Sequence, residues 1–67
     1  MPKNNVLIHC HNKAALDLLK EMNPLAGVLI QKDYPLHSQD ASLVINQLSS
    51  NGYYQGTDYT VRHAQRF

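Results

Sequence analysis

Cys10 is the only cysteine in the 67-residue chain, so an internal disulfide is excluded and a reducing compartment is favoured. The first five residues are too polar for a signal peptide, and no apolar run approaches the length needed to cross a membrane. We therefore expect a cytoplasmic protein with no membrane partner.

The chain also carries little net charge, because six lysines and arginines oppose five aspartates and glutamates. A net charge of +1 gives no electrostatic sign of a nucleic-acid protein, so nucleic acid is not the favoured partner. Sixty-seven residues allow a single domain, residues 1–67, with loose ends expected at residues 1–5 and 64–67. A domain of this size is marginally stable by itself, which favours homodimerisation or a complex with another protein.

Hydrophobic patterning divides the first part of the chain into a strand and a helix. Residues 6–10 are a short apolar run rich in β-branched residues and predict a strand. Asn12 is a suitable N-cap for the helix that follows, and Asn23-Pro24 ends this helix. Its apolar residues recur at helical spacing and are Ala15, Leu18, Leu19 and Met22.

Residues 25–34 are ambiguous between a strand and a helix. Asn23 as an N-cap, with Pro24 at the first helical position, would start a helix. We favour a strand over residues 27–31, because glycine, valine and isoleucine together are poor helix formers.

Residues 38–61 predict a helix, a glycine stop and a hairpin. Apolar residues recur at i, i+3, i+4 and i+7 from Ala41, which places one apolar stripe on one face of the helix. Asn51-Gly52 ends the helix, since glycine accepts the left-handed conformation. Residues 53–61 then predict a tyrosine-rich hairpin around a turn at residues 55–58.

The resulting order is strand, helix, strand, helix, hairpin. We interpret it as an α+β domain of the order β-α-β-α-ββ, with a mixed sheet and two helices on one face. If residues 25–34 are helical instead, the order becomes that of a winged helix-turn-helix. Residues 38–48 would then be the recognition helix, and residues 54–61 the wing.

The side of helix 38–51 opposite its apolar stripe predicts a contact surface for a partner. Asp40 is the only charge between residues 39 and 50, and Leu43 lies nearly across the helix from the stripe. A solvated helix face normally carries lysine and glutamate, whereas the centres of interfaces are depleted of charge. The predicted partner-binding residues on the helix and the hairpin are Gln39, Leu43, Asn46, Gln47, Ser50, Tyr53, Tyr54, Tyr59 and Arg62.

His9-Cys10-His11 is a second, less favoured candidate site. A strand that ends in a cysteine before a helix is the arrangement of cysteine-dependent phosphatases, but Leu16 stands where they need a phosphate-binding arginine. His9 and His11 lie on one side of an extended strand, yet a structural zinc site needs two further ligands. We therefore predict no catalytic residue, no metal site and no cofactor.

The sequence shows no Ser–His–Asp set, paired carboxylates or phosphate-binding loop, so an enzyme is not expected. We predict a small non-enzymatic protein that binds another protein as an inhibitor or adaptor, of the kind found in phages and mobile elements. The alternative is a winged-helix DNA-binding transcriptional regulator. A second alternative is a metal- or cysteine-dependent activity around residues 9–11.

Overall fold

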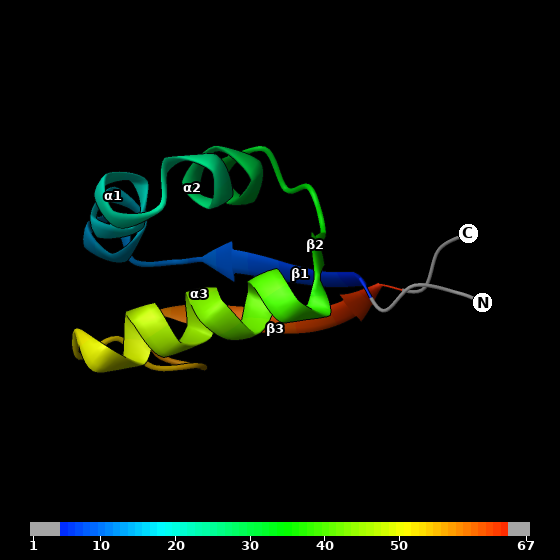
Figure 1. Ribbon diagram of the computed structural model, residues 1–67. Coiled ribbons are helices and arrows are strands. Elements are labelled where there is room, and N and C mark those ends of the chain that lie inside the picture. Colours follow the sequence, from blue (N-terminus) through cyan, green and yellow to red (C-terminus); the bar gives the residue numbers. More distant parts are fainter. Residues whose placement is uncertain (1–4, 65–67) are drawn as a thin grey trace.

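The computed structural model describes residues 5–64 as three helices and a three-stranded sheet (Figure 1). In chain order the elements are β1 (Asn5–Cys10), α1 (Lys13–Met22), α2 (Pro24–Gln31), β2 (Leu36–His37), α3 (Ser38–Ser50) and β3 (Tyr59–Ala64). The loose ends predicted at residues 1–4 and 65–67 lie outside the described residues, whereas Asn5 and Ala64 form a strand pair. Each helix of the described part is too short, or too polar, to cross a membrane.

The sheet is antiparallel and has the strand order β2-β1-β3. The central strand, β1, pairs with β3 along its whole length, with Ile8 opposite Val61, and with β2 at Asn5 and Val6. The predicted mixed sheet is therefore wrong. Because the residues expected to form a parallel strand are helical, both neighbours of β1 run against it.

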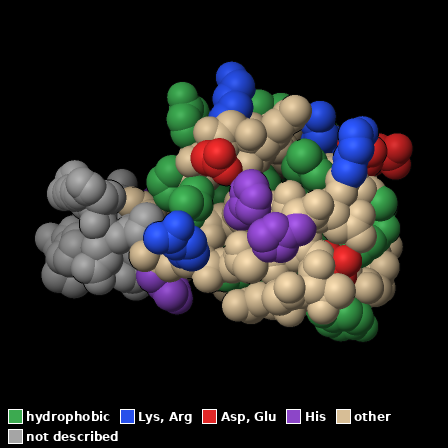
Figure 2. Space-filling model, turned by 180° about the vertical axis from the view of Figure 1, so that it is seen from behind, with side chains coloured by type: hydrophobic (Ala, Val, Ile, Leu, Met, Phe, Trp, Pro, Cys, Tyr) green, Lys and Arg blue, Asp and Glu red, His purple; other side chains and the backbone are tan. Residues whose placement is uncertain are grey.

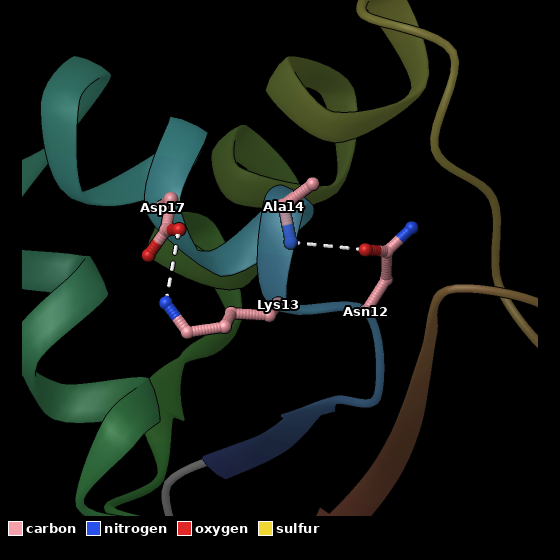
Figure 3. A network of polar contacts seen from close by, with 4 residues as sticks. All are labelled: Asn12, Lys13, Ala14 and Asp17. Atoms are coloured by element: carbon pink, nitrogen blue, oxygen red, sulfur yellow. Dashed lines mark hydrogen bonds and ion pairs between the residues drawn. The ribbon is translucent and has the colours of Figure 1, made fainter.

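Helix α1 begins where the sequence predicts. Asn12 Oδ1 accepts a hydrogen bond from the backbone N–H of Ala14 at 2.9 Å (Figure 3). One turn of the helix is also bridged by an exposed ion pair, in which Lys13 Nζ lies 3.4 Å from Asp17 Oδ2. The cap satisfies one of the N–H groups that the first turn of a helix leaves unpaired.

Residues 24–31 form α2, so the predicted strand over residues 27–31 is wrong. Asn23 closes α1 and caps α2: its N–H donates to the last turn of α1 at 2.7 Å, and its Oδ1 accepts from the N–H of Ala26 at 3.4 Å. With Pro24 at the first helical position, this cap outweighs the weak helix propensity of the residues that follow. Gly27 is needed where α2 crosses α1, since a Cβ there would lie 2.9 Å from the Cα of Lys20.

Helices α2 and α3 end in the same type of turn. In both, a backbone N–H (Tyr34 after α2, Tyr53 after α3) donates to the carbonyl five residues earlier at 2.9 Å. This bond defines the Schellman motif, whose left-handed residue is usually glycine. After α3 that residue is Gly52, with a φ of +89°, but after α2 it is Asp33, with a φ of +60°. An aspartate thus occupies a position where glycine fits with less strain.

Residues 53–58 form a loop, so the predicted hairpin is wrong. The partner of β3 is β1, and Gln55 makes only a single bridge to Tyr59. The loop is held by Asp58, whose carboxylate accepts from Asn12 Nδ2 at 3.0 Å and from the N–H of Tyr54 at 2.8 Å. These two bonds, with that of Asn12 the larger cause, lower the pKa of Asp58 from its ordinary value. The wing expected at residues 54–61 of a winged helix-turn-helix is therefore not formed.

One hydrophobic core joins all six elements on one side of the sheet. The predicted apolar stripe of α3 is confirmed, since Ala41, Val44 and Leu48 are buried. Along β1, Val6 and Ile8 enter the core. Among residues 5–64, the buried hydrophobic residues that form this core are Val6, Ile8, Ala15, Leu19, Ala26, Ile30, Leu36, Ala41, Val44, Leu48 and Tyr59. The protein is thus a small compact α+β domain in which three helices, and not two, cover one face of the sheet.

Candidate protein-contact surface

The outer side of α3 carries the residues that the sequence predicts for partner binding. Leu43 is 51% exposed at the middle of this side. Asp40 is the only charged residue of the helix. Gln47 is half-buried, and its Oε1 is buried without a hydrogen-bond partner among residues 5–64. The remaining predicted residues of α3 are all exposed and are Gln39, Asn46 and Ser50.

Helix α2 adds a second uncharged surface that the sequence interpretation missed. Its eight residues include no charged side chain, and Gln31 is the only polar one. A helix that is apolar on all sides is normally buried, yet Leu25 is 72% exposed and Val28 is 42% exposed. The absence of charge over residues 24–31 was the available signal, but these residues were assessed only for their strand and helix propensities.

A small hollow of about 90 Å³ lies between α2 and the start of α3. Its lining residues are Asn23, Leu25, Ala26, Leu29, Leu36 and Asp40. Leu43 and Gln47 follow Asp40 at i+3 and i+7, so they continue the rim of the hollow along the same side of α3. We call this surface the α2–α3 face and define it by Leu25, Leu29, Asp40, Leu43 and Gln47.

The aromatic and basic residues predicted on a hairpin do not lie together. Tyr54 is exposed in the loop after α3, and Tyr53 is half-buried against the core. Tyr59 is 2% exposed, so it is a core residue and cannot contact a partner. Desolvation by burial, together with the nearby Cys10 and Asp58, raises the pKa of Tyr59. The prediction grouped these side chains because it paired residues 53–54 with β3, whose partner is β1.

The residues of the second candidate site, 9–11, divide between two faces of the sheet. Cys10 is half-buried against the core, and burial raises the pKa of its thiol. A catalytic cysteine has a lowered pKa instead. His9 and His11 are exposed on the other side, with their ring centroids 5.1 Å apart. Within residues 5–64, no three His, Cys, Asp or Glu side chains are placed to hold one metal ion.

The fold and this surface define a small α+β domain with a charge-poor helical face. Comparisons with protein-family models, with curated proteins and with solved structures find no match to the chain. What the protein does is therefore inferred from its exposed residues.

Proposed function

We propose that the protein is a non-enzymatic binding protein that acts by protein–protein contact through the α2–α3 face, as an inhibitor or adaptor. The observation that carries this proposal is the pair of exposed leucines, Leu25 and Leu43, on two helices that together hold one charge. Interface centres combine apolar anchors with few charges, whereas freely solvated helices carry many.

Burial of the exposed leucines on this face would stabilise a complex. Fully burying one leucine side chain stabilises by roughly 1.5–3 kcal/mol relative to leaving it exposed. Leu25 and Leu43 are only partly exposed, so each contributes less than this full amount. The hollow lined by Leu25 and Asp40 would accept one apolar side chain of the partner, in the manner of an interface hot spot. The half-buried amide of Gln47, whose Oε1 lacks a described partner, would gain a hydrogen bond in such a complex.

Affinity capture with a matched pair of variants tests the proposal. The tagged protein is used to capture proteins from its native host, and captured proteins are identified by mass spectrometry and then titrated as purified partners. Leu43→Arg should weaken binding of the specific partner by about tenfold or more, because it removes a partly exposed apolar anchor and places a charge in the interface.

Ala14→Arg is the matched control, because Ala14 is an exposed residue of α1 away from the α2–α3 face. It should leave binding unchanged, and both variants should keep the far-ultraviolet circular dichroism of the wild type. Equal binding by Leu43→Arg and the wild type would contradict the use of this face. Light scattering of the purified protein tests whether the partner is a second copy of the chain.

The alternative of a DNA-binding regulator finds less support. Duplex recognition by α3 would need lysines or arginines to contact phosphates, and α3 has none. A gel shift with duplex DNA at low salt tests this alternative, since even non-specific binding should appear there.

A further inference from the structure

The sheet has a second face, on the side away from the core. Strand residues alternate between the two faces, so Leu7 and His9 of β1 share this second face with Thr60 and Arg62 of β3. The register confirms their proximity, because Leu7 lies opposite Arg62 and His9 lies opposite Thr60. His9 and Arg62 are exposed, whereas Leu7 and Thr60 are half-buried. We call these four residues, together with His11 and Asp33, the open sheet face.

Two imidazole rings and one carboxylate stand at one end of this face. The rings of His9 and His11 meet edge to face with an interplanar angle of 77°. Asp33 Oδ1 lies 3.6 Å from His9 Nδ1. Asp33 reaches this position because it is the left-handed residue of the turn after α2. Figure 2, which views the molecule from the side opposite Figure 1, shows two neighbouring histidines with acidic and basic side chains close by.

A hollow of about 360 Å³ lies over the open sheet face and is larger than the hollow beside α2. It is lined by Leu7, His9, Asp33, Thr60 and Arg62. This volume falls within the range of small-ligand sites, and its lining combines an apolar floor with a guanidinium, a hydroxyl, an imidazole and a carboxylate. The chemistry differs from that of the α2–α3 face, which has no cationic side chain.

We propose that the open sheet face binds single-stranded nucleic acid. Arg62 supplies two parallel N–H donors for a phosphate, and the hydroxyl of Thr60 can donate beside it. His9 and His11 present ring faces and edges on which an unpaired base stacks, as aromatic and histidine side chains do in single-strand recognition. Asp33, which lies beside His9, accepts from a base amino group, as acidic side chains do from cytosine.

A duplex does not fit this surface as well as a single strand. Reading a duplex requires a helix or a β-ribbon that enters a groove. Here the strands themselves form the surface, and the bases must be unpaired to lie against His9 and His11. The proposal is independent of the protein-contact function, since the two faces lie on opposite sides of the sheet and share none of their defining residues.

Fluorescence anisotropy with a labelled single-stranded oligocytidine dodecamer tests this proposal. At low salt, about 50 mM, we expect saturable binding that weakens by only about 2.5-fold toward about 200 mM salt, because Arg62 is the one lysine or arginine lining the hollow. Arg62→Gln should weaken binding by about tenfold through the lost phosphate contact. His9→Ala should weaken it by about fivefold or more, which is the lower end of what one stacked base contributes. Gln55→Ala, in the exposed loop, is the control and should bind as the wild type does.

Three results would overturn the proposal, provided that circular dichroism shows folded variants. The first is the absence of saturable binding at low salt. The second is binding of the matching duplex as tightly as the single strand. The third is unchanged affinity in both Arg62→Gln and His9→Ala, which would place any binding on another surface. Leu43→Arg, which tests the protein-contact function, alters none of these side chains. Each proposal can therefore fail without affecting the test of the other.

Discussion

Replacing Gly27 by alanine sets two effects of opposite sign against each other. In a helix interior, alanine is more favourable than glycine by about 1 kcal/mol, so propensity alone predicts a more stable protein. The added Cβ, however, would lie 2.6 Å from Cγ and 2.9 Å from Cα of Lys20 on α1. The side chain of Lys20 can move aside, but its Cα is part of the α1 backbone.

The contact with the backbone of α1 decides whether Gly27→Ala stabilises or destabilises the protein. Ordinary van der Waals contact begins at 3.4 Å, so α1 would have to retreat by about 0.5 Å from α2, the difference between 2.9 Å and 3.4 Å. That movement loosens the packing of Leu19 and Ile30 in the core. Overpacking of this kind costs typically about 1–3 kcal/mol, which exceeds the propensity gain. We expect a net loss of about 1 kcal/mol in the free energy of unfolding, or about 4–8 °C in Tm for a domain of this size.

Urea and thermal unfolding, followed by circular dichroism at 222 nm as is usual for helices, measure this effect. Gln31→Ala is the control in the same helix, because Gln31 is exposed and its change should stay within about 0.5 kcal/mol. The double variant Lys20→Ala/Gly27→Ala separates the two contacts, since it removes Cγ and keeps Cα. This double variant should recover only part of the free energy of unfolding that Gly27→Ala loses. A Gly27→Ala protein as stable as the wild type, or more stable, would refute the close approach of α1 and α2.

Three further predictions concern the core, the strained turn and the loop. Leu48→Ala should destabilise by about 2–5 kcal/mol, because Leu48 is fully buried, and urea unfolding should show a largely unfolded population in water. Asp33→Gly should raise the free energy of unfolding by about 0.5–1 kcal/mol, because glycine relieves the strain of the left-handed φ. An unchanged urea midpoint would contradict this gain in stability. The same substitution should weaken oligocytidine binding. Asp58→Asn should be less stable than the wild type at neutral pH. The folded state lowers the pKa of Asp58, so the Asp58 carboxylate stabilises the fold at pH values above the ordinary aspartate pKa of about 3.9. This stabilisation is lost as the pH falls through the lower pKa of the folded state. The urea midpoints of Asp58→Asn and the wild type should therefore converge in acid.

The local elements were largely predictable because their signals are local. The run at residues 6–10, the cap at Asn12 and the stripe from Ala41 each lie within one element and appear as expected. At residues 25–34 two local signals conflicted, and the cap formed by Asn23 and Pro24 outweighed the β-branched composition. The pairing of β3 with β1 was beyond such reasoning, since it joins residues 59–64 to residues 5–10.

The same limit applies to the candidate surfaces: features that lie within one element could be predicted, whereas features that depend on strand pairing could not. The exposure of Leu43 could be predicted from its place opposite the apolar stripe of α3. The burial of Tyr59 could not, because it depends on which strand lies beside β3. The open sheet face also required the register, since it brings His9 and Arg62 together from opposite ends of the chain.

The pairing of β1 with β3 also bears on how the protein folds during its synthesis. The two strands begin at residues 5 and 59, so the ribosome must add 54 residues before the central strand meets its longer neighbour. Until then α1 and α2 can associate through local contacts, but Ile8 lacks the strand that carries Val61. Contacts so distant in sequence form late and slow the folding of a small domain. A nascent chain stalled before residue 59 therefore exposes an apolar strand edge, which is the kind of surface that chaperones cover.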